Sequence, residues 1–323
     1  MARILVTEPI PESAIELLST AGEVTIGKKG SYHSDEELLQ EIAEFDALLC
    51  MLSTPVTSAV LKAGKNLKVV ANFAVGYNNI DVNTARELDI KVANTPDVLT
   101  EACGDFAMGL LLALSRKFPQ AENYLRAGKF KGWEPLGFLG MELRGKTLGI
   151  IGMGRIGQAF ARRAKAFGMD IAYHNRNRIK QSIEQELNTT YYESHFELAR
   201  HSDVLSVNCP LTDETFHLVD EKLLNVLPKH ALLINISRGA VVDEAALAEA
   251  LHNNNIAGAG LDVFEEEPAV LPRLLTAPNT LLLPHIASAT FETRDAIGRL
   301  AAQAIVSVLK GVPASEIPNL ISR

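Results

Sequence analysis

The chain has 323 residues, of which 47% are hydrophobic and 22% are charged, and its formal net charge is −8. This composition is typical of a folded globular protein and excludes collagen, coiled-coil and disordered chains. The negative charge, with no run of five basic residues, argues against binding to nucleic acid or to an anionic membrane. The three cysteines form no Cys-x-x-Cys pair, so we expect neither a disulfide scaffold nor a metal site.

The sequence contains neither a membrane-span pattern nor a secretion-signal pattern. Its densest apolar run, Gly109–Leu114, is far shorter than the roughly 18–20 residues that cross a bilayer. The chain starts directly with an apolar strand pattern, without the charged segment and apolar core of a signal peptide. Because the cysteine usage also suits a reducing compartment, we expect a cytoplasmic protein.

Short apolar strands alternate with helical patterns over the first hundred residues. Strands are predicted at Arg3–Val6, Val24–Ile26, Ala47–Cys50, Val69–Ala71 and Val92–Ala93, and helices at Pro11–Ala21 and Asp35–Phe45. This alternation is typical of a mostly parallel sheet that is covered by helices on both faces.

The alternation is interrupted by an apolar helix at Glu101–Ser115 and by an irregular stretch at Lys117–Gly145. A loop of that length is unusual in a compact domain, so the stretch is predicted to be functional or an interface arm. A second series has predicted strands at Thr147–Ile151, Ile171–His174, Val204–Asn208, Ala231–Asn235, Ala259–Val263 and Thr280–Leu283, and a last helix at Phe291–Leu309. Two such series indicate two α/β domains with a cleft between them.

A glycine-rich loop at Gly152-Met153-Gly154-Arg155-Ile156-Gly157 follows the first strand of the second series. In this pattern Gly152 makes the tight turn, Gly154 lets the backbone approach a pyrophosphate, and Gly157 allows close packing of helix and strand. The helix that follows offers free N–H groups and a positive dipole to the anion. The strand before and the helix after therefore predict a dinucleotide site.

The next strand ends in a segment that bears on cofactor choice. An NAD site is expected to carry a carboxylate about 20 residues after the glycine loop, where it binds the ribose 2′-hydroxyl. Here the strand is followed by Asn175, Arg176 and Asn177. Because an arginine can pair with a 2′-phosphate, Arg176 favours NADP(H), with NAD(H) as the alternative and Arg178 as a second cation.

Three further polar side chains follow apolar strands of the second series. Arg238, Glu267 and His285 each come just past the carboxyl end of a predicted strand. In open α/β sheets those ends face the ligand crevice. Reduction of a ketone needs a proton donor, which a histidine oriented by a carboxylate provides, and an arginine can grip a substrate carboxylate. The three residues therefore predict a dehydrogenase site.

Several motifs, taken together, resemble the D-isomer-specific 2-hydroxyacid dehydrogenases. The resemblance runs from about Phe45 to Pro313 and rests on Asn72–Asp81, Asn94–Glu101, the glycine loop, Pro210-Leu211-Thr212 and the segments of Arg238, Glu267 and His285. It implies a nucleotide domain inserted in a lid domain built from both termini. The expected fold class is therefore α/β, with two doubly wound parallel sheets and an interdomain cleft.

The resemblance also implies domain boundaries. Residues 1–98 and 288–323 would form a flavodoxin-like lid that binds substrate. Residues 99–287 would form a Rossmann-type dinucleotide domain, and its arm at about 117–145 would serve a homodimer.

Residue roles follow from the same resemblance. Arg238 would bind the carboxylate and carbonyl of the substrate, Glu267 would tune His285, and His285 would donate the proton. Asp262 would contact the nicotinamide carboxamide. The backbone N–H groups of Val75 and Gly76 would hold the substrate carboxylate. Further cofactor contacts are expected at Gly152, Gly154, Arg155, Ile156, Gly157, Asn175, Arg176, Asn177, Pro210, Thr215 and Ile236.

Within the family, Pro135–Gly140 and Asn175–Asn177 are most similar to NADPH-dependent glyoxylate/hydroxypyruvate reductases. The expected substrate is thus a small 2-oxoacid, glyoxylate or hydroxypyruvate, and the product glycolate or D-glycerate. 2-Ketogluconate and other 2-oxoacids stay open, because one methylene in a pocket is worth only about 1–3 kcal/mol. A distant alternative is a binding protein like the C-terminal-binding-protein corepressors, which share the fold and the three polar residues and use the dinucleotide to control assembly.

Overall fold

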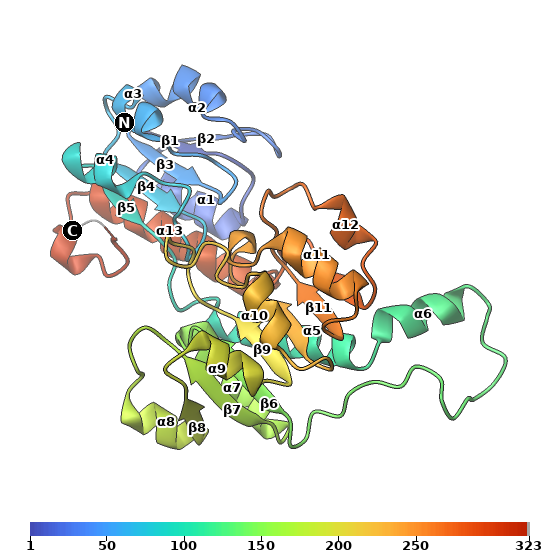
Figure 1. Ribbon diagram of the computed structural model, residues 1–323. Helices are drawn as coiled ribbons and strands as arrows, with labels where there is room; N and C mark the ends of the chain where they lie inside the picture. The colour runs from blue at the N-terminus through green and yellow to red at the C-terminus, as the bar shows by residue number, and fades with distance from the viewer. Residues whose placement is uncertain (322–323) are drawn as a thin grey trace. The chain divides into compact units, whose positions relative to one another are not determined.

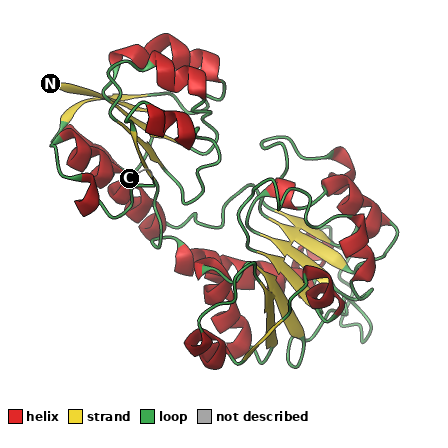
Figure 2. Cartoon of the chain, turned by 60° about the vertical axis from the view of Figure 1, so that its left-hand side comes forward, coloured by secondary structure: helices red, strands yellow, loops and turns green. Residues whose placement is uncertain are grey.

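The computed structural model describes residues 1–321, and the chain divides into two compact units (Figures 1 and 2). The first unit combines Met1–Leu99 with Ala289–Arg323, and the second is Thr100–Ser288. Each unit contains one wholly parallel sheet with helices on both faces. The prediction of two doubly wound α/β domains is confirmed.

The first unit has a five-stranded sheet in the order β2-β1-β3-β4-β5, which is the flavodoxin-like order. Its strands are β1 (Ala2–Val6), β2 (Gly22–Ile26), β3 (Ala47–Cys50), β4 (Val69–Asn72) and β5 (Lys91–Ala93). Its helices are α1 (Glu12–Ser19), α2 (Asp35–Glu41), α3 (Ser58–Ala63), α4 (Val82–Glu87) and α13 (Phe291–Leu309), with short turns η1 (Ile42–Glu44) and η3 (Ala314–Glu316).

Alternating strand residues of this sheet are buried on opposite faces. On one face Leu48 and Val70 lie in an apolar cluster with Leu38 of α2 and Val60 of α3. The other face is covered by α1 and by α13, which packs against β3 and β4. The last helix of the chain therefore belongs to the first unit, although nearly two hundred residues separate it from β5.

The second unit has a seven-stranded sheet in the order β8-β7-β6-β9-β10-β11-β12. Its strands are β6 (Thr147–Ile151), β7 (Asp170–His174), β8 (Thr189–Tyr191), β9 (Val204–Val207), β10 (Leu232–Asn235), β11 (Gly258–Leu261) and β12 (Thr280–Leu282). Its helices are α5 (Thr100–Ser115), α6 (Phe118–Arg126), α7 (Arg155–Ala166), α8 (Gln181–Leu187), α9 (His195–Arg200), α10 (Glu221–Val226), α11 (Glu244–His252) and α12 (Pro272–Leu275), with the turn η2 (Gly239–Val241).

The strand order of the second unit is that of a Rossmann fold with one strand added. If the strands are numbered in chain order from β6, their spatial order across the sheet is 3-2-1-4-5-6-7. The order reverses between β6 and β9, because the chain moves outward from β6 through β7 and then returns to β9 on the other side. Ligands of open α/β sheets bind at such a switch point, beyond the carboxyl ends of the strands.

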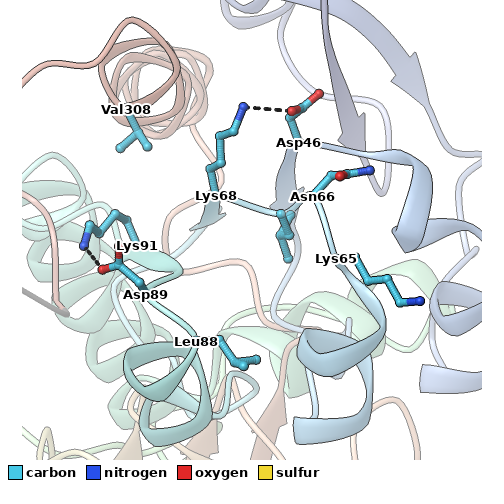
Figure 3. Close-up of a pocket in the computed structure, with 9 residues that line it drawn as sticks. Asp46, Lys65, Asn66, Lys68, Leu88, Asp89, Lys91 and Val308 are labelled. Atoms are coloured by element: carbon cyan, nitrogen blue, oxygen red, sulfur yellow. Dashed lines mark hydrogen bonds and ion pairs between the residues drawn. The ribbon is translucent and has the colours of Figure 1, made fainter.

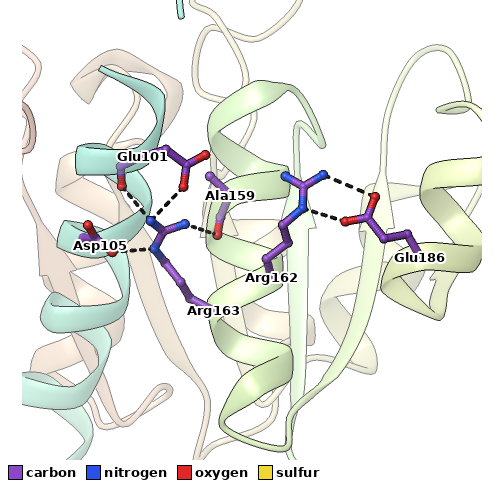
Figure 4. Close-up of polar contacts among 6 residues, drawn as sticks. All are labelled: Glu101, Asp105, Ala159, Arg162, Arg163 and Glu186. Atoms are coloured by element: carbon purple, nitrogen blue, oxygen red, sulfur yellow. Dashed lines mark hydrogen bonds and ion pairs between the residues drawn. The ribbon is translucent and has the colours of Figure 1, made fainter. Parts of the chain in front are cut away.

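Helix α5 packs closely against α7 within the second unit (Figure 4). A glycine at position 104 allows this, since a Cβ there would lie 2.9 Å from the Cβ of Ala159. Arg163 of α7 donates from Nε to Asp105 at 2.6 Å, and its Nη2 lies 2.9 Å from the Glu101 carboxylate. The start of α5 is thus fixed to α7 by one close backbone approach and by one arginine.

Two elements differ from the sequence-based prediction. Helix α6 lies within the stretch that was predicted to be irregular, and β8 was not predicted at all. Helix α6 is nine residues long and buries none of them, and its large apolar side chains Phe118 and Leu125 are exposed. Strand β8 is a three-residue edge strand with no fully buried residue, and it therefore lacks the apolar run of a central strand.

Within residues 1–321 no helix combines the length and the apolar character that a bilayer crossing requires.

The α5–α7 contact leads to a stability prediction. Gly104→Val should lower the free energy of unfolding by about 1–3 kcal/mol, because the added carbons overpack the contact with Ala159. The matched control is Gly109→Ala on the same helix, where a Cβ would meet nothing within 4 Å. That change should raise stability by up to about 1 kcal/mol through helix propensity. Urea unfolding of both variants measures the difference, and equal shifts would contradict the close packing at Gly104.

Candidate active site

The predicted site residues of the second unit gather at one edge of its sheet. All seven strands are parallel, so their carboxyl ends lie at the same edge. Along that edge the glycine loop follows β6 and Asn175 follows β7, whereas Arg238, Asp262 and His285 follow β10, β11 and β12. The five steps from β7 to β12 span about 24 Å at roughly 4.8 Å per strand. The glycine loop and Asn175 therefore lie on one half of this edge, and the acid–base candidates lie on the other half together with the cofactor candidates Ile236 and Asp262.

The glycine loop lies at the switch point and is closely packed. Gly152 has φ +99°, and a Cβ there would lie 2.5 Å from the backbone nitrogen of Cys209, just after β9. A Cβ at Gly157 would lie 2.5 Å from the carbonyl oxygen of Gly152. Both positions therefore require glycine, as the sequence pattern predicts.

The middle glycine fits the approach of a ligand. Gly154 is exposed, and a Cβ there would meet no protein atom within 4 Å. Gly154 is also the N-cap of the 12-residue helix α7, where no side chain accepts from the first N–H groups. Arg155 is exposed and Ile156 is half-buried in the first turn. Such a helix start suits the pyrophosphate of a dinucleotide.

The polar residues of the segment after β7 make different contacts. Asn175 accepts the Met153 N–H at 2.6 Å through Oδ1, which ties this segment to the glycine loop. Arg176 and Asn177 are exposed, and Arg176 lies 3.5 Å from the carboxylate of Glu214. Arg178 is held by two hydrogen bonds, of 2.7 and 3.1 Å, to Glu184. Because the Arg178 guanidinium is already paired with Glu184, Arg176 is the better candidate to pair with a 2′-phosphate.

The loop after β9 is closed by one of the predicted cofactor residues. The Thr215 hydroxyl donates to the carbonyl of Pro210 at 2.7 Å and accepts the Thr212 N–H at 2.8 Å. The side chain of Thr215 thus shapes the loop, and Pro210 is exposed at its start.

Glu267 and His285 form a hydrogen-bonded pair. The Nδ1 atom of His285 lies 2.8 Å from Oε2 of Glu267, and Oε1 of Glu267 accepts the Phe264 N–H at 3.0 Å. Burial raises the pKa of Glu267, but the hydrogen bond and charge of His285 and the charge of Arg238 lower it, and the net pKa lies below its ordinary value. Glu267 therefore stays ionised through the neutral range.

Arg238 is electrostatically coupled to the same carboxylate. Burial lowers the pKa of its guanidinium, while the charge of Glu267 raises it. Its Nη1 donates to the carbonyl of Ser237 at 2.7 Å. Asn235, which is 1% exposed, donates from Nδ2 to the Arg238 carbonyl at 2.9 Å. The predicted residues Arg238, Glu267 and His285 are thus brought together, and Ile236 lies buried between Asn235 and Ser237.

Asp262 holds the backbone that carries the histidine. Its carboxylate accepts the N–H groups of Ile286 and Ala287, both at 2.8 Å, and its carbonyl accepts the His285 N–H at 2.9 Å. His285 has φ +54°, a left-handed conformation that costs energy for a residue with a Cβ. Burial raises the pKa of Asp262, against these hydrogen bonds, which lower it. The three contacts hold the strained position, and the contact of Asp262 with a nicotinamide stays a prediction.

Val75 and Gly76 lie in the first unit, shortly after β4. Asn94 donates to the Val75 carbonyl at 2.8 Å, and Asn72 donates to the Gly76 carbonyl at 2.6 Å. The first bond orients the peptide that carries the Gly76 N–H. The peptide that carries the Val75 N–H is oriented through the Ala74 carbonyl, which accepts the Thr95 N–H at 3.0 Å. Their role toward a substrate stays a prediction.

Two hollows lie at the amino ends of strands, and none of the candidate site residues lines them. In the first unit a hollow of about 490 Å³ lies at the amino ends of β3, β4 and β5 (Figure 3). Of its three lysines, Lys68 and Lys91 are paired with Asp46 and Asp89. In the second unit a hollow of about 410 Å³ is lined by residues at the amino ends of β6 and β7 and by β8. Among the described residues no group of acidic, histidine or cysteine side chains could hold a metal ion.

Two supporting residues were not predicted from the sequence. Asn235 and Glu244 are buried polar side chains that hold the turns carrying Arg238 and Glu267. Asn235 ends an apolar strand, and that position is the one signal that could have identified it. For Glu244 the sequence offers no signal beyond an acidic residue at a helix start, where such residues are common.

The comparisons with known proteins agree with this geometry. Residues 108–287 match the model of the D-isomer specific 2-hydroxyacid dehydrogenase NAD-binding domain. The glyoxylate reductase of Thermococcus litoralis is 44% identical, over 99% of this chain and 97% of the relative, and that of Aeropyrum pernix is 46% identical, over 99% and 96%. The NADPH-dependent glyoxylate/hydroxypyruvate reductase of Sinorhizobium meliloti, solved with NADP and malonate, is 39% identical with a TM-score of 0.87, covering 99% of this chain and 98% of that chain. This chain therefore belongs to the D-isomer specific 2-hydroxyacid dehydrogenase family and is an NAD(P)-dependent enzyme of that family.

Proposed function

We propose that this protein is an NADPH-dependent reductase of glyoxylate or hydroxypyruvate, which yields glycolate or D-glycerate. The observation that carries the proposal is the 2.8 Å hydrogen bond between Glu267 and His285, at the same sheet edge as Arg238 and the glycine loop. The names of the relatives favour these substrates over 2-ketogluconate, and they favour an enzyme over a corepressor-like binding protein.

His285 donates the proton. Reduction of a 2-oxoacid builds negative charge on the former carbonyl oxygen, which a general acid must protonate. Because Nδ1 of His285 is hydrogen-bonded to Glu267, Nε2 is the nitrogen that delivers the proton. The ionised Glu267 orients the ring and stabilises the imidazolium before the transfer.

Arg238 binds the substrate. Its planar guanidinium matches a carboxylate with two parallel N–H donors, and Asn235 holds the turn on which it lies. We assign the backbone N–H groups of Val75 and Gly76 to a substrate carboxylate, supported by Asn94, which holds the Val75 carbonyl, and by the Thr95 N–H, which holds the Ala74 carbonyl. A substrate held by its carboxylate presents its keto oxygen in a defined orientation.

The residues around the glycine loop fit a dinucleotide. When bound, NADPH supplies the hydride that reduces the carbonyl carbon. The open position at Gly154 and the N-terminal turn of α7 would hold the pyrophosphate. Asn175–Asn177 and Pro210–Thr215 would line the rest of the cofactor, with Ile236 and Asp262 at its nicotinamide end. The preference for NADPH rests on Arg176 and on the missing carboxylate after β7.

We propose a cytoplasmic homodimer that is joined through α6 and the following arm. Residues 127–142 and α6 expose large apolar side chains, and Trp133 is 85% exposed. An exposed apolar set of this size marks a protein interface. The three cysteines are free thiols, which suits a reducing compartment. Light scattering should give twice the mass of one chain in solution, and the mass of a single chain would contradict the dimer.

Replacement of the proton donor tests the reaction. His285→Ala should lower kcat for glyoxylate reduction at least about a hundredfold, because the general acid is lost. The readout is the loss of NADPH absorbance on addition of glyoxylate. The control is His252→Ala, a histidine at the end of α11 that contacts the carbonyl of Arg273 and should keep full activity. Near-normal turnover by His285→Ala would overturn the assignment.

Cofactor choice is tested at Arg176. Arg176→Ala should weaken NADPH binding about tenfold or more and leave NADH binding nearly unchanged, because only the 2′-phosphate loses its charged partner. The control is Arg162→Ala on α7, where the arginine is paired with Glu186 (Figure 4). Titration of cofactor fluorescence measures both affinities. An unchanged ratio of the two dissociation constants in Arg176→Ala would refute the phosphate contact.

The pH dependence of stability follows from Glu267. Its pKa in the folded protein lies below the ordinary value of 4.5, so its ionisation stabilises the fold above that value. This contribution is lost as the pH falls through the folded-state pKa. The difference in free energy of unfolding between the wild type and Glu267→Gln should therefore be largest near neutral pH and shrink in acid. Urea unfolding at pH 7 and in the acid range measures it, and a difference that grows in acid contradicts the lowered pKa.

A further inference from the structure

The segment Phe264–Leu271, which connects β11 to α12, carries Glu267 in its middle. Residues 266–269 are exposed, so little packing holds this part of the segment in place. Within it, Glu267 accepts the Phe264 N–H and Ala269 donates to the Glu266 carbonyl at 2.8 Å. These bonds shape the loop but stay within it. The Glu265 side chain pairs with His217, which follows β9, and the backbone of the segment needs a further anchor.

One buried carboxylate supplies that anchor. Glu244, the first residue of α11, is only 5% exposed. Its Oε1 accepts the Glu265 N–H at 2.7 Å. Glu265 lies two residues before Glu267 in the chain. The Glu244 side chain thus ties the first part of the segment to the start of α11.

The attachment point is close to the other residues of the site. A Cβ at Gly239 would lie 1.8 Å from the carbonyl carbon of Phe264, so the segment rests directly on the backbone that follows Arg238. Helix α11 contacts α12, the element to which the segment leads (Figure 1). Glu244 therefore holds the segment at a fixed place beside the turn of Arg238.

Capping of α11 does not account for the burial of Glu244. An acidic residue in the first turn favours a helix by its charge, and this effect does not require burial. The capping is done by Asp243, whose side chain accepts the Ala246 N–H at 2.9 Å. Burial raises the pKa of Glu244, and the Glu265 N–H opposes this shift. A carboxylate that is buried and directed at a backbone donor of the loop holds the loop.

We propose that Glu244 is a positioning residue for catalysis, which fixes the segment Phe264–Leu271 so that Glu267 meets the imidazole of His285. The proposal rests on the proposed function, because it assigns to Glu244 the placement of the acid–base pair. Glu244 acts on the orientation of His285, and its loss would leave substrate binding by Arg238 largely intact.

Two variants of Glu244 and one matched control test the proposal. Glu244→Ala should lower kcat about 10- to 100-fold, as expected for a misplaced catalytic group, with little change in KM for the 2-oxoacid. Glu244→Gln keeps an acceptor oxygen and should give an intermediate kcat. The control is Glu249→Ala on the same helix, whose carboxylate pairs with Arg273 at an exposed site and should leave kcat unchanged.

A double-mutant cycle separates positioning from a general loss of structure. If Glu244 acts through Glu267, Glu244→Ala should cost far less in a Glu267→Gln background than in the wild type. Equal costs in both backgrounds, or wild-type kcat in folded Glu244→Ala, would overturn the proposal.

Amide hydrogen exchange gives a readout that needs no substrate. In the wild type the Glu265 amide should be protected, and in the Glu244 variants it should exchange at least about tenfold faster than in Glu249→Ala. If the wild type reduces neither glyoxylate nor hydroxypyruvate, the proposed function fails, while exchange still decides whether Glu244 holds the segment. If Glu244→Ala does not fold, Glu244→Gln and the wild-type exchange decide, and an unprotected Glu265 amide in the wild type would refute the anchor.

Discussion

The parallel direction of the seven strands in the second unit is the constraint on which the site depends. Parallel strands end at one edge, so polar residues that follow different strands come together even when more than a hundred residues separate them. The strand order then sorts them. The glycine loop and Asn175 fall on the β6–β7 half, and Arg238, Glu267 and His285 fall on the β10–β12 half.

Backbone geometry at this edge is held by buried side chains. His285 adopts a left-handed conformation, and the carboxylate of Asp262 holds the next two N–H groups. Glu267 lies on an exposed segment, and Glu244 accepts the Glu265 N–H in the first part of that segment. In both cases a buried acid, satisfied by backbone donors, fixes a group that must itself remain accessible. Buried carboxylates are tolerated when their oxygens are hydrogen-bonded in this way.

The charges of the site are balanced within one small group. Arg238 is cationic, Glu267 is kept ionised by its neighbours, and His285 shares its Nδ1 atom with Glu267. This arrangement leaves Arg238 to hold an anionic substrate and leaves the other ring nitrogen of His285 for proton transfer. Removal of Glu267 would therefore disturb both the orientation and the charge of the pair, which is why its ionisation couples to stability and to the reaction.

The alternation of strands and helices, the glycine loop and the polar residues that follow the strands could all be predicted from the amino-acid sequence. These features are local, because glycines, apolar runs and strand ends are encoded within a few residues of one another. The pairing of Arg178 with Glu184, the support that Asp262 gives to the backbone after His285, and the contact of Glu244 with the segment of Glu267 depend instead on how the chain packs. The structure also reveals α6, which buries none of its residues, and β8, a three-residue edge strand without a buried residue. Hydrogen bonds between residues far apart in the chain depend on how the elements pack, and no local pattern specifies that packing.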